Sequence, residues 1–190
     1  MTRTTSEDND EALVKRLRNG DSAAFAALYD RNAAKIYSYA YHRLGSQADA
    51  EELTKQAFVS AYRRLLGEDF EPRIGFRPFL YRTTHALIAE FLQRRRREGA
   101  FATDLALTSS QDRTPEEELE SDDTRQELQE AIAELADDQK QVIILKYVDG
   151  LTNPEVAEVL GKTERAVKTL QQRALASLGR VIGVRREASN

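Results

Sequence analysis

The stretch TNPEVAEVLGKTERAVKTLQQRALASL, residues 152–178, decides the fold of the C-terminal part of the chain. Thr152 and Glu155 have the spacing of a capping box, with Asn153 as a competing cap, and either cap predicts a short helix. Gly161 follows that helix and permits a sharp turn, because glycine adopts a positive φ without steric cost. A short helix and a tight turn are therefore predicted at the start of this stretch.

A second helix is predicted from residue 164 to residue 178, with Thr163 as its N-cap. Ala157 is small at the point where the two helices would cross closely, and Val167 would pack into the angle between them. This combination of small, turn and packing residues is typical of a helix-turn-helix. In that motif the second helix lies in the major groove of DNA.

The exposed side of the second helix is predicted to carry side chains that donate hydrogen bonds to base edges and phosphates. These are Thr163, Arg165, Lys168, Thr169, Gln172 and Arg173. No carboxylate follows Glu164 before residue 178. The pattern indicates a surface for duplex DNA, and the alternative is an ordinary helical hairpin with a solvated basic face.

The composition is that of a charged, cysteine-free chain of 190 residues. Only 9 Gly and 4 Pro are present, so long uninterrupted stretches favour helix over sheet. The absence of Cys excludes disulfides, thiolate zinc sites and cysteine nucleophiles, and it fits a reducing cytoplasm. The N-terminus is polar, and no apolar run approaches the roughly 20 residues that span a bilayer. We therefore expect a cytoplasmic protein with no membrane insertion of its own.

The net charge of −4 is concentrated in the middle of the chain. Residues 104–138 hold 13 acidic and 2 basic side chains, whereas residues 1–103 hold 14 and 17, and residues 139–190 hold 5 and 9. Two mildly basic ends therefore flank one acidic segment, so the net charge does not argue against nucleic acid. Residues 98–122 are predicted to be a flexible acidic linker, because they contain few apolar residues to bury.

The rest of the chain is predicted to form two small helical domains, which makes the fold all-α. Residues 11–97 carry apolar side chains at helical spacing, and Ser46 is predicted to cap one of these helices. Residues 123–182 form the second domain, around the helix-turn-helix. Residues 1–10 are predicted to be a disordered tail and residues 183–190 a second tail.

Two parts of the chain resemble one family. The segment LADDQKQVIILKYVDGLT, residues 135–152, leads into the helix-turn-helix and resembles, with it, the fourth region of bacterial RNA polymerase sigma factors. DAEEL at residues 49–53 resembles the polymerase-binding helix of the second region, and FLYR at 79–82 with RRRR at 94–97 resembles its promoter-melting helix. With these two regions and a short linker, the chain resembles the extracytoplasmic function (ECF) class, the smallest sigma factors.

The resemblance implies a protein that binds core RNA polymerase and directs promoter-specific transcription initiation. It assigns the −35 promoter element to the helix at 164–178, through the six donor side chains named above. It assigns recognition and melting of the −10 element to residues 67–97, through Phe70, Arg73, Ile74, Phe76, His85, Arg94, Arg95 and Arg96. It assigns binding of core polymerase to Asp49, Glu51, Glu52, Leu53, Lys55, Gln56 and Phe58.

The partners implied are the β′ clamp helices and the β flap of core polymerase, together with promoter DNA. The protein would associate with the nucleoid when it is bound to polymerase. An anti-sigma factor is a further candidate partner, and it would hold the protein near the membrane if it were membrane-bound. A stand-alone helix-turn-helix regulator remains an alternative that needs no polymerase.

The N-terminal half departs from the family pattern at several positions. Lys55-Gln56 stands where the family usually has Gln-Glu, and Ala86 stands where an Asn often holds the −10 bases. These departures motivate a second alternative, a sigma-like protein with weakened promoter opening. The Arg run at 94–97 is predicted to neutralise phosphates, although such a run also complements the C-terminal end of a helix dipole.

No group of residues suggests catalysis. His42 and His85 lie in different predicted helices, and no phosphate-cradling glycine loop is present. The acids Asp8, Asp10 and Glu11 are more typical of a solvated tail than of a metal site. We therefore expect no catalytic residue, metal site or cofactor, and the chemistry would belong to the polymerase.

Overall fold

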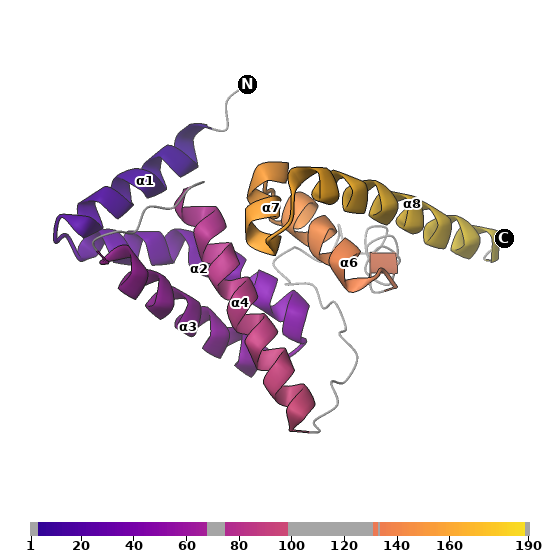
Figure 1. Cartoon of the computed structure of the whole chain (residues 1–190), viewed down its shortest axis with the longest axis horizontal. Helices are drawn as coiled ribbons and strands as arrows, with labels where there is room; N and C mark the ends of the chain where they lie inside the picture. Colours follow the sequence, from indigo (N-terminus) through magenta and orange to yellow (C-terminus); the bar gives the residue numbers. More distant parts are fainter. Residues whose placement is uncertain (1–3, 68–74, 99–130, 133, 189–190) are drawn as a thin grey trace, which may run out of the picture.

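The computed structural model describes residues 4–67, 75–98, 131–132 and 134–188. Every regular element among them is helical, which confirms the predicted all-α fold. The elements are α1 (Thr4–Arg18), α2 (Ala23–Leu44), α3 (Gln47–Leu65), α4 (Phe76–Arg97), α6 (Asp137–Ile143), the π-helical turn η1 (Ile144–Val148), α7 (Asn153–Leu160) and α8 (Glu164–Ala188). Helices α1–α4 form a bundle, and α6–α8 form a second helical unit beside it (Figure 1).

Local sequence signals set the turn between α2 and α3. Gly45 ends α2 in the left-handed region, at φ 67°, and its N–H donates to the carbonyl of Tyr41 at 2.9 Å. Ser46 is extended and its hydroxyl accepts a hydrogen bond from the N–H of Asp49 at 3.4 Å. Ser46 therefore caps α3, as predicted.

Local signals also build the helix-turn-helix. The Glu155 carboxylate accepts hydrogen bonds from the N–H and the hydroxyl of Thr152, at 2.5 and 2.6 Å, which stabilises the start of α7. Gly161 has a φ of 61°, and the Thr163 hydroxyl accepts from the N–H of Ala166 at 3.2 Å. Val167 is fully buried between the helices. The predicted turn, caps and packing residue are confirmed.

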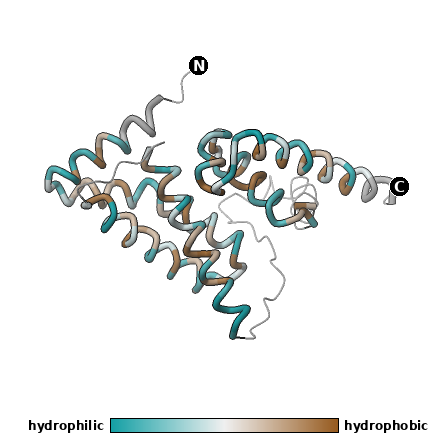
Figure 2. Tube along the Cα trace, in the orientation of Figure 1, coloured by the Kyte–Doolittle hydropathy of each residue, from teal (hydrophilic) through white to brown (hydrophobic). Residues whose placement is uncertain are grey.

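The two helical units share one hydrophobic core. Hydrophobic and hydrophilic residues alternate along the helices (Figure 2). The cluster that contains Tyr39 and Tyr81 of the bundle continues into Leu145, Leu151 and Val156 of the C-terminal unit, all at most 1% exposed. The units are therefore docked on each other. Residues 99–130, which include most of the predicted linker, lie outside the described residues.

Both predicted tails are shorter than expected. Helix α1 begins at Thr4, and Asp10, predicted to lie in a disordered tail, is 5% exposed. Its carboxylate accepts from the Asn32 amide at 3.2 Å and pairs with Arg31 at 3.3 Å, which fixes α1 on α2. At the other end, α8 continues to Ala188 rather than ending at Leu178. Val181 and Ile182 extend its apolar stripe by packing on a second buried cluster.

Candidate nucleic-acid interface

The first part of α8 presents an exposed surface of hydrogen-bond donors. All six side chains predicted to read the −35 element are exposed: Thr163, Arg165, Lys168, Thr169, Gln172 and Arg173. The opposite side of the helix carries Val167 and Ala174, which are fully buried, so packing fixes the direction in which the donors point. Arg165, Lys168 and Arg173 form no ion pair with any described residue. This donor face is therefore available to base edges and phosphates.

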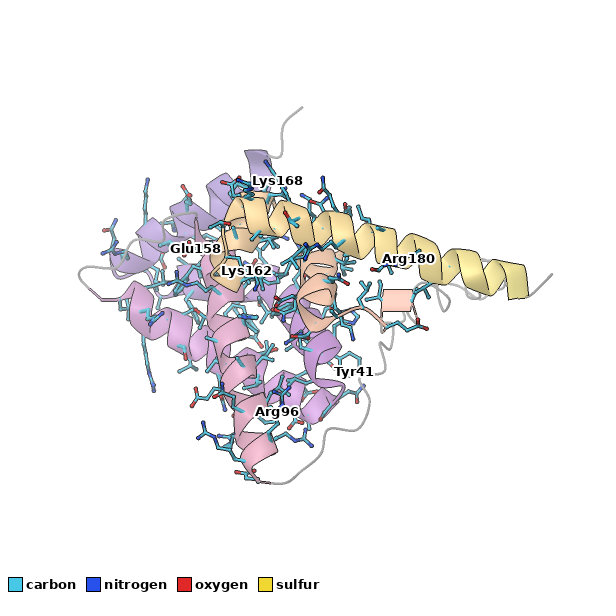
Figure 3. The ribbon with its side chains drawn as sticks, turned by 45° about the vertical axis from the view of Figure 1, so that its right-hand side comes forward. Tyr41, Arg96, Glu158, Lys162, Lys168 and Arg180 are labelled. Carbon is cyan, nitrogen blue, oxygen red and sulfur yellow. The ribbon has the colours of Figure 1, made fainter. Side chains whose placement is uncertain are left out.

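A second basic surface lies at the end of α4. Arg94, Arg96 and Arg97 are exposed there, while Arg95 pairs with Asp49 at 3.3 Å. The guanidinium groups of Arg94 and Arg95 both lie 5.6 Å from the centre of the Phe91 ring. Arg96 on α4 and Lys168 on α8 lie at opposite ends of the molecule in Figure 3. The two basic surfaces are therefore separate.

The other residues assigned to the −10 element are not brought together. Phe70, Arg73 and Ile74 lie outside the described residues. Phe76 is 1% exposed and belongs to the hydrophobic core, so its ring cannot contact DNA in this conformation. Its burial follows from its place as the first residue of α4, where it packs inside the bundle. Sequence spacing alone did not distinguish this core role from a DNA-binding one.

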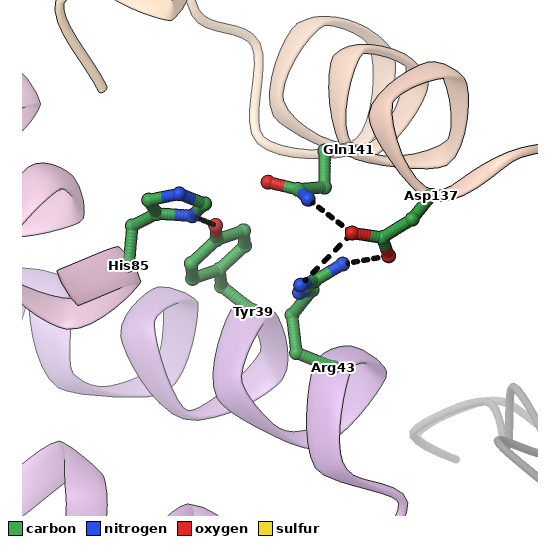
Figure 4. A network of polar contacts seen from close by, with 5 residues as sticks. All are labelled: Tyr39, Arg43, His85, Asp137 and Gln141. Carbon is green, nitrogen blue, oxygen red and sulfur yellow. Dashed lines mark hydrogen bonds and ion pairs between the residues drawn. The ribbon is translucent and has the colours of Figure 1, made fainter. Parts of the chain in front are cut away.

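His85 lies in a polar network between the bundle and the C-terminal unit (Figure 4). Its Nδ1 lies 3.1 Å from the hydroxyl of Tyr39 on α2. One turn along α2, Arg43 pairs with Asp137 of α6 at 2.5 Å, and the Gln141 amide donates to the same carboxylate at 2.7 Å. Burial lowers the pKa of His85, and the nearby charge of Arg43 lowers it further. His85 is therefore neutral at pH 7 and offers DNA no positive charge in this conformation.

The Arg43–Asp137 pair is asymmetric in its exposure. The side chain of Arg43 is 8% exposed, whereas that of Asp137 is 67% exposed. Burial on its own would raise the pKa of Asp137, but the hydrogen bond and charge of Arg43 hold it below the ordinary value. The pair therefore links a buried cation of the bundle to the surface of the C-terminal unit.

Helix α3 presents four of the seven residues assigned to polymerase binding on its exposed side. Glu51, Glu52, Lys55 and Gln56 are exposed, and Gln56 donates to Glu52 at 2.8 Å. Leu53 and Phe58 are 4% and 2% exposed, so they support this face from the core rather than form part of it. Val59 was not predicted, although it is 49% exposed and lies one turn beyond Lys55. An apolar residue at an exposed helical position was the signal for it.

Two further arginines of α4 contact the C-terminal unit, and the sequence did not predict either contact. Arg82 pairs with Glu158 of α7, and Arg77 donates to the backbone carbonyl of Asp149. A cavity of about 650 Å³ opens beside these contacts, lined by His85 and Ala86 of α4 together with residues of α7. Helix α7 therefore covers part of the α4 surface assigned to the −10 element.

Asp149, in the turn before α7, is buried under this contact. It is 7% exposed, and burial raises the pKa of its carboxyl to about 7. The Tyr81 hydroxyl and the charges of Arg77 and Lys35 favour the ionised form. Neither Asp149 Oδ2 nor the Tyr81 hydroxyl makes a hydrogen bond of standard geometry within the described residues. The docking of the two units therefore places this carboxyl in surroundings that, on balance, disfavour its ionised form.

None of the described helices combines the length and apolar character needed to cross a membrane.

Comparison with known proteins identifies two family regions. Residues 28–98 match sigma-70 region 2, and residues 125–178 match sigma-70 region 4. The ECF RNA polymerase sigma factor BldN of Streptomyces coelicolor is 32% identical over 185 residues, which cover 95% of this chain and 70% of BldN. The ECF RNA polymerase sigma factor SigW of Bacillus subtilis is 28% identical over 174 residues, which cover 87% of this chain and 92% of SigW.

The same fold occurs in a solved structure of CnrH in complex with the cytosolic domain of CnrY. The TM-score is 0.67 at 24% sequence identity, and the match covers 93% of this chain and 99% of that one. The likeness extends over both helical units and supports the arrangement described above.

Proposed function

This chain belongs to the ECF class of RNA polymerase sigma factors, which direct promoter-specific transcription initiation, and from that premise we propose that α8 reads the −35 element. The observation that carries the proposal is the donor face of α8. Arg and Lys donate well to guanine O6 and N7, and Gln can donate and accept at adenine. Residues at the start of a recognition helix contact base edges, which is where Arg165, Lys168 and Thr169 lie.

We further propose that α4 engages the −10 element and that α3 binds the polymerase clamp. Three exposed arginines at the end of α4 supply positive charge that suits the phosphates of a melted strand. The exposed side of α3 combines charged residues with Val59, which suits a protein partner better than DNA. Because RNA polymerase and promoters lie in the cytoplasm, the protein would act there.

An anti-sigma factor is a reasonable partner, because CnrH, which has the same fold, was solved with the cytosolic domain of CnrY. A sigma-like protein with weakened promoter opening is a second candidate function. The observation that favours it is Ala86, which lies in the cavity beside α7 and cannot donate a hydrogen bond to a base. Equal initiation from duplex and from pre-melted promoter templates would remove the reason for this second candidate.

Run-off transcription with purified core polymerase tests the proposal. The protein should support initiation from a genomic promoter, and Lys168→Ala should reduce it. Arg180→Ala is the matched control, because it removes the same charge from the same helix at an exposed site about two turns beyond Arg173, the last residue of the donor face (Figure 3). Failure of the native protein to bind core polymerase or to initiate from any promoter would refute the proposal. Equal loss in both variants would refute the proposal that residues at the start of α8 contact bases of the −35 element.

A further inference from the structure

Helix α1 lies outside the matched family regions and crosses one side of the bundle. The match to sigma-70 region 2 begins at residue 28, whereas α1 ends at Arg18. Helix α1 extends from the start of α4 to the end of α3 (Figure 1). Residues 68–74 connect these same two helices, and they lie outside the described residues. The helix therefore reaches both ends of the segment that joins α3 to α4.

Buried contacts fix α1 on the bundle. Leu13, Val14 and Leu17 are at most 8% exposed and share the hydrophobic core with Phe76, the first residue of α4. The buried carboxylate of Asp10 ties the helix to α2. Because apolar burial and a buried polar contact act together, α1 can neither rotate nor slide without loss of both. Its exposed side chains therefore have set directions.

Arg18 contacts the first end of the segment. Its Nη2 donates to the backbone carbonyl of Gly67 at 3.4 Å. Gly67 lies two residues beyond the end of α3, and its own N–H donates to the carbonyl of Arg64 at 3.1 Å. Both backbone groups of Gly67 are therefore engaged, one in the turn that ends α3 and the other by α1.

Glu11 lies at the second end of the segment. Gly75, the residue before α4, has a φ of 92°, which residues with a side chain rarely adopt. A Cβ at Gly75 would lie 3.5 Å from Glu11 Oε1, so the Glu11 side chain packs beside this backbone. Phe76 follows and is 1% exposed. The second end is therefore held between α1 and the hydrophobic core.

We propose that α1 is a positioning element for −10 recognition, because it holds Gly67 and Gly75 and so fixes both ends of the segment between them. This role rests on the proposed function, since the segment contains three of the residues that the resemblance assigns to the −10 element: Phe70, Arg73 and Ile74. Arg18 is the positioning residue at the first end, and it acts through the backbone of Gly67.

The two kinds of DNA contact should depend on α1 to different degrees. A side chain that reads a base has to be held within about 0.5 Å of its place, which requires a fixed backbone beneath it. The phosphate contacts proposed for the end of α4 do not depend on Gly67. Loss of the Arg18 contact should therefore lower the discrimination between −10 sequences more than it lowers initiation itself.

Run-off transcription by the holoenzyme measures this discrimination, as the ratio of initiation from the native −10 element to initiation from one with a substituted base pair. Arg18→Ala should lower the ratio about threefold at the position where the native protein discriminates most, as expected for the loss of one exposed hydrogen bond. Arg18→Lys keeps a donor and should recover most of the ratio. Arg16→Ala is the matched control, because it removes the same charge from the same turn of α1 but its partner is Asp21.

A merely structural role for Arg18 would lower initiation from every −10 variant alike and leave the ratio unchanged. The free energy of unfolding in urea and the discrimination between −35 variants should stay at their native values in Arg18→Ala. An unchanged −10 ratio, an equal fall in Arg16→Ala, no recovery in Arg18→Lys or a parallel fall in −35 discrimination would overturn the positioning role and leave the proposed function intact. A native protein that initiates without preference at any −10 base pair would instead refute the proposed −10 function.

Discussion

Asp149→Asn is the substitution that most sharply tests the docked interface. Asp149 belongs to the turn before α7 and is 7% exposed, and its carboxyl faces Tyr81 and Arg77 of α4. Asn has nearly the same shape but carries no titrating proton. The comparison between the two proteins therefore isolates the free energy of ionising this one buried carboxyl.

The magnitude follows from the pKa of Asp149. Burial raises it from the ordinary 3.8 to about 7, so the folded protein holds this proton more tightly than the unfolded chain does. The resulting stability is fully present below pH 3.8 and is lost as the pH rises to about 7. Each pKa unit corresponds to about 1.4 kcal/mol, so the native protein loses about 3 kcal/mol from this group between pH 5 and pH 8.

Urea unfolding of both proteins at pH 5 and pH 8 would measure the effect. The free energy of unfolding of Asp149→Asn minus that of the native protein should rise by about 3 kcal/mol between the two pH values. Asp137, His42 and His85 titrate in both proteins and cancel in this difference. A difference that stays constant between pH 5 and pH 8 would show that Asp149 is solvated, and the docked interface would then be wrong.

Three further predictions concern helix α8, the turn between α7 and α8, and helix α3. Arg165→Ala should weaken promoter binding by about 1–3 kcal/mol if it reads a base, measured by competition with promoter variants, whereas a phosphate contact would weaken binding to all sequences alike. Gly161→Ala should cost about 1–2 kcal/mol of stability in urea unfolding, because φ is 61° there and no clash adds to the backbone strain. Val59→Asp should weaken binding to core polymerase about tenfold in a pull-down titration, and an unchanged affinity would exclude this side of α3.

The helix-turn-helix could be predicted from sequence because its signals are local. Thr152 and Glu155 are three residues apart, and Gly161 and Thr163 act within one turn of the chain. Such caps and turns depend on neighbouring backbone groups alone. The donor face of α8 followed from the same helical spacing, since Val167 fixes which side is buried.

The docked interface could not be predicted, because its contacts join residues far apart in sequence. Arg82 and Glu158 are 76 residues apart, and each has the ordinary appearance of a solvated helical charge. Asp149 precedes a Gly and has the pattern of an exposed turn, yet tertiary packing buries it. The burial of Phe76 could not be predicted for the same reason, since the pattern of one helix does not reveal what covers it.

We propose above that residues at the start of α8 contact bases of the −35 element within the initiating polymerase. A double-mutant cycle in run-off transcription tests it most directly, by combining Lys168→Ala with substitution of the −35 base pair to which initiation is most sensitive. The combined change should reduce initiation little more than either change alone, because both remove one contact. Full additivity of the two losses at every −35 position, with the same cycle repeated for Arg165→Ala, would show that neither side chain contacts a −35 base.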